Sequence, residues 1–469
     1  MHSIDIDIDA SQERQTETKK KSVILLVLVS FVSLSMIVGI FLALYLNLHD
    51  LNGVNHTDID DMVGYGDNSD MANGHPHEKY PTIVVSLDGF RYDYLQRGLT
   101  PHLDSLKDNG YYADYMTPQF PSKTFPNHYS LATGLLPKYH GIFGNHMYDP
   151  VAKKAFSTYD PSWFGGEPIW VTAEKANIPT ACYFWFGCSV PIKNRSPSLN
   201  YPNYTTTDSD IIFNQIGDWR VSYKDGMNGS APLLTMAYIY EVDDRAHTFG
   251  PESSQVNDEI VKVDRNVGDL ISRLKQNQLF NKTNIIIVSD HGMASLSSSR
   301  VINLDDYFNT SCVVIGDLSP ISFLFPIDGL ITKEQLYESL AHKHPNMSVY
   351  YREDIPAHYQ LYQDSLPYNA RLSPVFVVAD LGWQVVTNKM EERKGDHGYD
   401  NQETDMRAIF IAHGPNIKSR LSMPTDTLPT SFRNVELYNL LISLLGIDKT
   451  NAALNNGTTL LSDKIFKFT

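Results

Sequence analysis

The stretch TIVVSLDGF, residues 82–90, decides the fold of this chain. Its first six residues are mostly β-branched or aliphatic, and Asp88 follows them directly. A short, nearly continuous apolar run is typical of a strand buried on both faces of a parallel sheet. Two later runs share this plan of an apolar strand followed closely by an aspartate. They are residues 233–240 before Asp243 and residues 284–289 before Asp290.

The segment between the second and third runs is predicted to form an amphipathic helix. Its apolar residues recur at intervals of three and four from Val256 to Leu274. A strand, a helix and a strand in this order indicate a parallel βαβ unit, and residues 408–412 form a fourth apolar run. Ligands of open α/β sheets gather beyond the carboxyl ends of the parallel strands. We therefore expect an α/β domain whose strand-end aspartates surround a site.

Aspartate or histidine occurs in five short polar clusters, several of which also contain glycine. Carboxylate oxygens and imidazole nitrogens are the ligands that zinc takes where thiolates are absent, and a catalytic zinc keeps one position open for substrate. Glycine permits close backbone approach beside such ligands. The sequence therefore predicts a catalytic metal site. The clusters are residues 87–91, 123–128, 243–247, 290–292 and 395–399.

Five motifs within and around these clusters are the most specific. They are SLDGF at 86–90, TFPNHY at 124–129, NHMYDP at 145–150, SDHGM at 289–293 and HGYDN at 397–401. In content and order they resemble the nucleotide pyrophosphatase/phosphodiesterase family, a compact, membrane-anchored type within the alkaline phosphatase superfamily. The resemblance implies an alkaline phosphatase-like α/β fold, with a largely parallel central sheet flanked by helices. It also implies hydrolysis of nucleotides, for example of a nucleoside triphosphate to the monophosphate and pyrophosphate.

The resemblance further implies two zinc ions and a threonine nucleophile. Thr124 would attack phosphorus and form a covalent nucleotidyl-threonine, which water then hydrolyses, and zinc beside its hydroxyl would ease loss of the proton. Pro126 indicates a helix start whose free N–H groups suit a phosphate oxygen, and Asn145 stands where the family places an amide that hydrogen-bonds this oxygen. One zinc would be held by Asp88, Asp290, His291 and Thr124, and the other by Asp243, His247 and His397.

Phe125 stands where family members that act on nucleotides place an aromatic ring against the base. Tyr204 or Tyr201 would supply the other face, and stacking of this kind tolerates any base. The chain departs from the family where Ala246 replaces a common glycine and where residues 184–188, FWFGC, replace a common Trp-Pro-Gly-Ser stretch.

Other functions compete with nucleotide hydrolysis. A phosphodiesterase of lipid-headgroup or choline phosphate esters, or a phosphomonoesterase, would use the same chemistry, and a non-catalytic ectodomain would use none. Phe125 and the lack of an obvious aromatic–acidic cluster for a quaternary ammonium favour nucleotides. Because the nucleophile and every expected ligand are in place, the sequence favours an enzyme.

Several polar residues near the motifs are given lesser roles. His128 is expected at a helix surface or cap, and His413 at the end of a strand. Lys123 either contacts phosphate or lies at the surface, and Asp396 either orients a histidine or is solvated. Arg245 places an unexpected charge beside the metal pocket.

The three cysteines cannot form a disulfide scaffold. Cys182 and Cys188 either close a small loop or remain free buried thiols, and Cys312 is left unpaired. The cysteines therefore leave the compartment undecided.

Residues 22–48 carry no charged side chain and are long enough to span a membrane as a helix. Lys19, Lys20 and Lys21 precede them, whereas an aspartate-rich segment follows, so the N-terminus is expected in the cytoplasm and the rest outside it. This asymmetry predicts a single-pass type II membrane protein with an extracellular or lumenal catalytic domain. The expected segments are a tail at 1–21, a signal anchor at 22–48, a flexible stalk at 49–79 and the phosphodiesterase domain at 80–469.

Two further observations concern the partners of this domain. The formal net charge of −16 argues against stable binding of nucleic acid, whose phosphates would be repelled. Eight Asn-x-Ser/Thr sequons fit a translocated domain that carries N-linked glycans. All of them lie beyond the predicted anchor, at Asn55, Asn194, Asn203, Asn228, Asn281, Asn309, Asn346 and Asn456.

Overall fold

The computed structural model describes residues 78–201, 206–222, 231–388, 393–424 and 429–467. These residues belong to one compact unit, residues 60–469. The predicted tail, the predicted anchor and nearly all of the predicted stalk fall within residues 1–77 and lie outside the described residues. No helix in the described part of the chain has both the length and the apolar character needed to cross a membrane.

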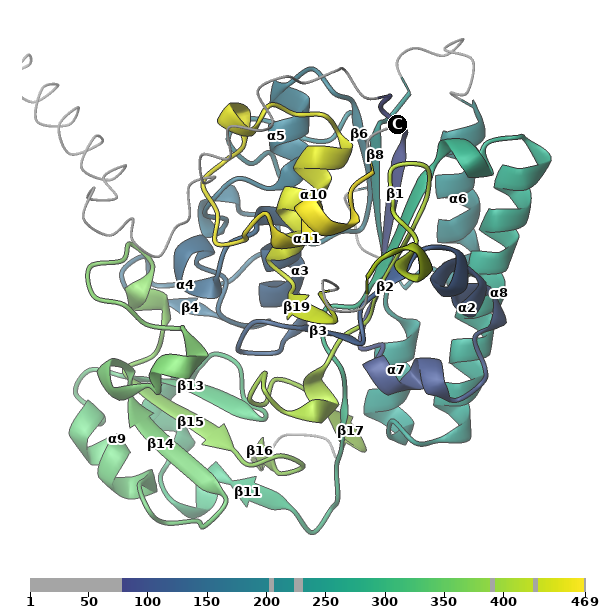
Figure 1. Ribbon diagram of the computed structural model, residues 1–469. Coiled ribbons are helices and arrows are strands. Elements are labelled where there is room, and N and C mark those ends of the chain that lie inside the picture. Colours follow the sequence, from purple (N-terminus) through teal and green to yellow (C-terminus); the bar gives the residue numbers. More distant parts are fainter. Residues whose placement is uncertain (1–77, 202–205, 223–230, 389–392, 425–428, 468–469) are drawn as a thin grey trace, which may run out of the picture. The chain divides into compact units, whose positions relative to one another are not determined.

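A mixed, largely parallel sheet of seven strands forms the centre of the unit (Figure 1). Four strands lie close to the four apolar runs of the sequence, and β1 begins and ends where it was predicted. In order across the sheet the strands are β2 (Tyr111–Tyr112), β18 (Phe410–His413), β9 (Asn284–Val288), β1 (Thr82–Leu87), β8 (Leu234–Ile239), β6 (Thr180–Tyr183) and β7 (Leu199–Tyr201).

The topology refines the predicted βαβ unit. Strands β8 and β9 are parallel, but β1 lies between them and pairs in parallel with both. The fourth predicted strand, β18, runs antiparallel to β9. The carboxyl ends of β9, β1 and β8 therefore meet at one edge of the sheet, which is where the strand-end aspartates were expected.

Two hydrophobic cores cover the two faces of this sheet. Alternate side chains of β1 divide between them: Val84 belongs to one core, and Ile83, Val85 and Leu87 to the other. This alternation explains why the strand is apolar throughout, since neither face is solvated.

Helices cover both faces of the sheet, as Figure 1 shows. On one side α8 follows the predicted amphipathic pattern, and the Ser253 side chain caps its first turn by accepting a hydrogen bond from Val256 N. Helices α2 (Pro101–Asn109), α6 (Ser209–Ser222) and α8 (Ser254–Gln276) lie on this side, and α3 (Thr124–Thr133), α5 (Ile169–Lys175), α10 (Glu436–Leu444) and α11 (Leu460–Ile465) on the other.

A second, smaller sheet has a core of its own. Its neighbouring strands all pair antiparallel, in the order β12 (Val313–Ile315), β13 (Ile321–Pro326), β15 (Val375–Ala379) and β14 (Met347–Tyr351), and α9 (Lys333–Leu340) packs on them. The two-stranded ribbon of β10 (Ala294–Ser295) and β17 (Gly395–Asp396) brings residue 397 toward the main sheet edge. The sequence did not predict this second sheet.

Candidate active site

Two aspartates at the ends of adjacent strands form the base of the site. Asp88 follows β1 and Asp290 follows β9, and both are almost completely buried, with exposed fractions of 1% and 0%. Gly89 N donates a 3.2 Å hydrogen bond to Asp290 Oδ1, and Tyr238 OH donates one of 2.5 Å to Asp88 Oδ2. A Cβ atom on Gly89 would lie 2.6 Å from Asp243 Oδ1, and Gly89 has a φ of +63°, so the close approach of these carboxylates requires glycine here.

Helix α7 (Glu241–Phe249) supplies the next two candidate ligands. Asp243 and His247 are one turn apart, so they project from the same side of the helix, with Oδ2 and Nε2 3.3 Å apart. The Asp-x-x-x-His spacing thus produces a two-ligand face. Arg245 points away from this face: its Nε lies 3.6 Å from Glu259 Oε2 on α8. The guanidinium therefore does not add a positive charge to the pocket.

The three candidate histidine ligands share one arrangement. In each of them Nδ1 lies against a backbone carbonyl oxygen, which holds the proton on that nitrogen and leaves the lone pair of Nε2 directed toward the aspartates. The pairs are His247 with Gly395 O at 2.7 Å, His291 with Gly292 O at 2.8 Å, and His397 with Ser122 O at 2.9 Å.

The ligand atoms gather into two overlapping groups. Within each group, all the atoms lie within 4.8 Å of one another. One group consists of Asp243, His247 and His397, and the other of Asp88, Asp243 and His291. Asp290 adjoins the second group, with Oδ2 3.0 Å from His291 Nε2. The six aspartates and histidines expected to hold metal therefore lie together, and Asp243 belongs to both groups.

The donor set fits divalent cations. One oxygen of each aspartate is buried and accepts no hydrogen bond from the described part of the chain: Asp88 Oδ1, Asp243 Oδ1 and Asp290 Oδ2. Buried carboxylate oxygens that accept no hydrogen bond are costly, and a bound cation would satisfy them. Three carboxylates with three imidazoles and no thiolate are ligands typical of zinc.

Charge is crowded in this cluster. Burial raises the pKa of Asp88 well above its usual range, and the neighbouring Asp290 carboxylate raises it further. Burial also opposes ionisation of Asp290, but the imidazoles of His291 and His128 outweigh it and hold the pKa of Asp290 well below its usual range. Burial lowers the pKa of His397, with a further contribution from His291. Cations in both groups would relieve the repulsion between the carboxylates.

Thr124 is the first residue of α3 and lines the same cleft. Its Oγ1 lies 3.4 Å from His291 Nε2. The helix start was expected at Pro126, and Pro126 is the third residue of α3, within its first turn. However, Phe125 N donates to Asn145 Oδ1 at 2.9 Å, so this N–H is not available to a phosphate as the sequence had suggested.

A cavity of about 400 Å³ joins the candidate ligands to a wall of aromatic rings. The rings of Phe125 and Phe186 stack with centroids 4.2 Å apart and an angle of 14° between their planes. The residues that line the cavity are Asp88, Thr124, Phe125, His128, Asn145, Thr158, Tyr159, Phe184, Trp185, Phe186, Gly187, Ser189, Tyr238 and Asp243.

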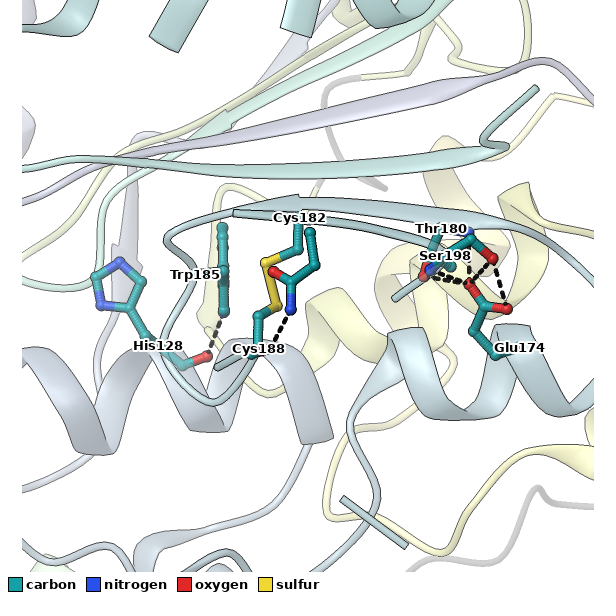
Figure 2. Close-up of a disulfide and its surroundings, with 8 residues drawn as sticks. His128, Glu174, Thr180, Cys182, Trp185, Cys188 and Ser198 are labelled. Atoms are coloured by element: carbon teal, nitrogen blue, oxygen red, sulfur yellow. Dashed lines mark hydrogen bonds between the residues drawn. A yellow bond between two sulfur atoms is a disulfide. The ribbon is translucent and has the colours of Figure 1, made fainter. Parts of the chain in front are cut away.

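The loop of residues 184–188 forms much of the aromatic wall, and it is fixed at several points. A disulfide joins Cys182, near the end of β6, to Cys188, so the closed small loop is the correct alternative for these cysteines. Trp185 Nε1 donates to His128 O at 3.1 Å, and Asn200 Nδ2 donates to Cys188 O at 2.6 Å. Figure 2 shows the disulfide and the hydrogen bond from Trp185 to His128 of α3. The stretch that departs from the family thus contributes directly to the cleft.

The two tyrosines proposed to stack the base have different outcomes. Tyr204 lies outside the described residues. Tyr201 is described, but it stacks on Tyr183 with centroids 4.7 Å apart, is 44% exposed and does not line the cavity. Its assignment to the base site is therefore not supported by its position. Tyr159 and Phe186, which the sequence did not single out, do line the cavity.

His128 was wrongly expected at a helix surface. It is completely buried, because α3 packs its side chain inward against the sheet. Its Nε2 lies 2.8 Å from Ser86 Oγ on β1, and its Nδ1 lies 2.9 Å from Thr124 O and 3.2 Å from Asp290 Oδ2. His128 therefore connects α3, the helix that begins at Thr124, to a candidate ligand.

Lys123 and Asp396 are also more buried than a surface position would allow. Lys123 is 5% exposed, and its Nζ donates to Ser319 O and lies 3.8 Å from Asp396 Oδ1. Asp396 is fully buried and accepts a 2.7 Å hydrogen bond from Ser319 Oγ, so it is not solvated. His413 ends β18 as expected, and its ring stacks on Phe280.

Cation ligands, a helix-start threonine and an aromatic wall meet in one cleft, which is the arrangement of a metal-dependent hydrolase. The family model described as "Type I phosphodiesterase / nucleotide pyrophosphatase" matches residues 82–400. The chain therefore belongs to the type I phosphodiesterase/nucleotide pyrophosphatase family and is a nucleotide pyrophosphatase/phosphodiesterase hydrolase.

Two human proteins illustrate the similarity. Ectonucleotide pyrophosphatase/phosphodiesterase family member 5 of Homo sapiens is 36% identical over 379 residues, which cover 79% of this chain and 75% of that protein. Bis(5'-adenosyl)-triphosphatase ENPP4 of Homo sapiens is 37% identical over 385 residues, which cover 80% of each. The alignment thus includes most of each protein.

Solved structures are also similar to most of the chain. Human ectonucleotide pyrophosphatase/phosphodiesterase 5 is 35% identical with a TM-score of 0.74, and the match covers 83% of this chain and 100% of that one. An inactive threonine-to-alanine variant of the murine protein, in complex with AMP, is 33% identical with a TM-score of 0.73 and the same coverage. These similarities establish the alkaline phosphatase-like fold.

Proposed function

We propose that this protein hydrolyses phosphodiester and pyrophosphate bonds of nucleotides with two zinc ions, through a covalent nucleotidyl-threonine on Thr124. The position of Thr124 Oγ1 carries the proposal. This oxygen is 3.4 Å from His291 Nε2 and faces the cleft between the candidate metal ligands and the Phe125 ring. The AMP complex of the murine relative supports a nucleotide ligand.

Two groups of ligands support two ions. Asp88, Asp290, His291 and the Thr124 hydroxyl would hold one ion, and Asp243, His247 and His397 would hold the other; Asp243 belongs to both groups of atoms. When bound, the ions would supply Lewis acidity, which lowers the pKa of a hydroxyl and offsets negative charge that develops at phosphorus.

The residues of the chain account for the remaining steps. Thr124 Oγ1 attacks phosphorus, and the bond from phosphorus to the leaving oxygen breaks, so that pyrophosphate, a nucleotide or an alcohol departs with the electron pair. Water then attacks the same phosphorus and restores the threonine hydroxyl. The Asn145 amide donates to a phosphate oxygen, and Phe125 stacks on the base.

The aromatic wall supports nucleotides over other phosphate esters. A cavity of about 400 Å³ falls in the range of small-molecule sites, and flat rings match the flat face of a base. The name of the human ENPP4 relative, a bis(5'-adenosyl)-triphosphatase, makes dinucleoside polyphosphates substrates to be tested here.

A substrate panel tests this proposal. The full chain, loaded with zinc, is assayed with ATP, diadenosine triphosphate, a nitrophenyl thymidylate ester, a choline phosphate ester and a phosphate monoester. We expect the three nucleotide substrates to give the highest kcat/KM. Preferential hydrolysis of the choline ester or of the monoester would refute the nucleotide assignment.

The covalent intermediate has its own test. Hydrolysis of a chiral phosphorothioate diester in labelled water should proceed with net retention at phosphorus, because two in-line displacements each invert the centre. Net inversion would mean that water attacks directly and that Thr124 only binds.

We also propose that the protein is a type II membrane protein whose catalytic domain faces the lumen or the cell exterior. The charge asymmetry around residues 22–48 supports this orientation. Mapping of N-glycans tests it: the exposed Asn194, Asn281 and Asn309 should be modified. Asn456 should not be, because it is 4% exposed and its Oδ1 accepts a hydrogen bond from Leu136 N. A protein expressed through the secretory pathway without any glycan would contradict the orientation.

A further inference from the structure

A buried carboxylate outside the metal cluster holds the segment that contains Asn145. Asp317, between β12 and β13 of the smaller sheet, is only 3% exposed. Its Oδ2 accepts a 2.7 Å hydrogen bond from Asn145 N, and its Oδ1 accepts one of 3.0 Å from His146 N. The Nδ1 atom of His146 lies 3.1 Å from the same Oδ1. One carboxylate on the second sheet therefore binds consecutive backbone amides beside the cleft.

The fit of this carboxylate is tight. A Cβ atom added to Gly144 would lie 2.1 Å from Asp317 Oδ2, so only glycine lets the loop approach this closely. The backbone around Asp317 is fixed as well, because Phe323 N donates to Asp317 O at 3.1 Å. The loop at residues 144–146 is thus held to β13 in one position.

The side chain of Asn145 is fixed at its other end. Its Oδ1 accepts the 2.9 Å hydrogen bond from Phe125 N, the residue after Thr124. With the oxygen engaged, the amide can only present its NH₂ group to the cleft, where Asn145 is one of the lining residues. Asn145 therefore connects Asp317, on the second sheet, to the first turn of α3.

We infer that Asp317 is a positioning residue for hydrolysis: it holds the backbone of Asn145 so that the amide donates to the phosphate as charge develops there. This inference rests on the role given to Asn145 in the proposed function. Hydrogen bonds from backbone N–H to a carboxylate are stronger than those to a neutral acceptor. A neutral amide at position 317 offers one carbonyl oxygen to two donors and turns its own NH₂ toward one of them.

The effect should appear in kcat rather than in binding. Removal of a donor that stabilises developing charge costs about 10²–10³ in kcat, and a small displacement of such a group costs up to about 10². Asp317→Asn should therefore lower kcat about 10- to 100-fold and change KM little. The substitution keeps the volume of the side chain, so the fold should be retained.

The test is a double-mutant cycle with Asp317→Asn, Asn145→Ala and both together. Each protein is assayed with bis(4-nitrophenyl) phosphate, which has no base, and with a nitrophenyl thymidylate ester. If Asp317 acts through Asn145, the double variant should be no slower than Asn145→Ala alone. The matched control is His146→Ala, because this side chain touches the same carboxylate but is 82% exposed, and its loss should leave kcat within about twofold.

Three results would overturn the inference: losses of kcat that multiply in the double variant, a rate of Asp317→Asn within twofold of the unaltered protein, or an unaffected Asn145→Ala variant. A general loss of folding would lower the thermal midpoint and the active fraction equally in all variants with an altered position 317. The base-free diester separates the two proposals. If the unaltered protein hydrolysed the diester but not the thymidylate ester, the nucleotide specificity would be refuted, and the role of Asp317 could still be tested with the diester.

Discussion

The cleft has a metal end, formed by the candidate metal ligands, and an aromatic end, formed by Phe125 and residues 184–188, and the two ends are held in place by different means. At the metal end, aspartates and histidines are each fixed by strand ends, a helix turn or a hydrogen bond from Nδ1 to a backbone carbonyl. At the aromatic end, the loop of residues 184–188 is fixed by a disulfide and by contacts to α3 and to Asn200. The two ends meet at Thr124 and Phe125, adjacent residues of α3.

This difference indicates how each end should respond to substitution. A metal ligand must offer a particular donor atom, so few residues can replace it, whereas a stacking wall requires only flat apolar surface in the right place. The metal end should therefore control kcat on every substrate. The aromatic end should control KM, and only for substrates that carry a base.

The largest effect is expected at Thr124. Thr124→Ala should lower kcat by several powers of ten on both the thymidylate ester and the base-free diester, because it removes the oxygen proposed to attack phosphorus. Thr124→Ser keeps this oxygen and should retain most of the activity. Zinc content and the thermal midpoint serve as controls: most of the zinc should be retained, because Asp88, Asp290 and His291 remain, and the midpoint should be unchanged. An alanine variant that turns over at a tenth of the normal rate would show that another group attacks phosphorus.

The next effect concerns Asp243, which is within reach of both ligand groups. Asp243→Asn should lower kcat by about 100-fold or more on both substrates and should reduce the zinc retained after dialysis, measured by mass spectrometry. Asp244→Asn is the matched control, since this neighbouring carboxylate is exposed and belongs to neither group. Equal kcat and equal zinc content in the two variants would show that Asp243 does not hold metal.

The metal end was largely predictable from the sequence. Strand β1 has the predicted bounds, and six residues chosen as ligands lie together, because strand-end aspartates in a parallel sheet converge on one edge. The order of strands was not predictable, since β1 separates β8 from β9 although it comes first in the chain. Pairing between strands depends on contacts across hundreds of residues, which a local pattern does not encode.

The other side of the cleft was much less predictable. The lesser role of His128 was wrong because a histidine in a helix gives no sign of which face is buried. Asp317 and Phe186 were missed because each acts through a residue distant in sequence: the Asp317 carboxylate binds Asn145 N, 172 positions away, and Phe186 packs on Phe125. Aspartate in a loop and phenylalanine in a chain with 21 of them carry no local signal of such roles.

A smaller effect should come from the disulfide of the aromatic wall. Replacing Cys182 and Cys188 together by serine should free the loop that carries Phe186 and raise KM for the thymidylate ester about tenfold, since stacking contributes about 1–3 kcal/mol per base. The kinetic constants for bis(4-nitrophenyl) phosphate should stay within about twofold. Cys312→Ser is the control, because this cysteine is free. If both substrates lost activity in parallel, the loop would serve the whole fold and not the base.

The smallest effect is expected from mild acid acting on His140. This effect should not distinguish the two ends of the cleft. This histidine is fully buried, its Nδ1 accepts a hydrogen bond from Ile142 N, and its Nε2 lies 3.0 Å from Ser130 Oγ on α3. Burial lowers the pKa of His140 from 6.5 to about 3.

Above pH 6.5 neither the folded nor the unfolded chain binds a proton here, so stability is unaffected. As the pH falls from 6.5 toward 3, only the unfolded chain takes up the proton, and the folded state loses about 1.4 kcal/mol by pH 5.5. The thermal midpoint should therefore fall by a few degrees between pH 7 and pH 5.5. Both substrates should lose activity together only near the midpoint temperature, since α3 carries Thr124 and Phe125. His140→Gln cannot take up this proton and should have a shallower dependence of the midpoint on pH, whatever its stability at pH 7. An equal slope in the two proteins would show that other groups, and not His140, set the acid stability of this helix.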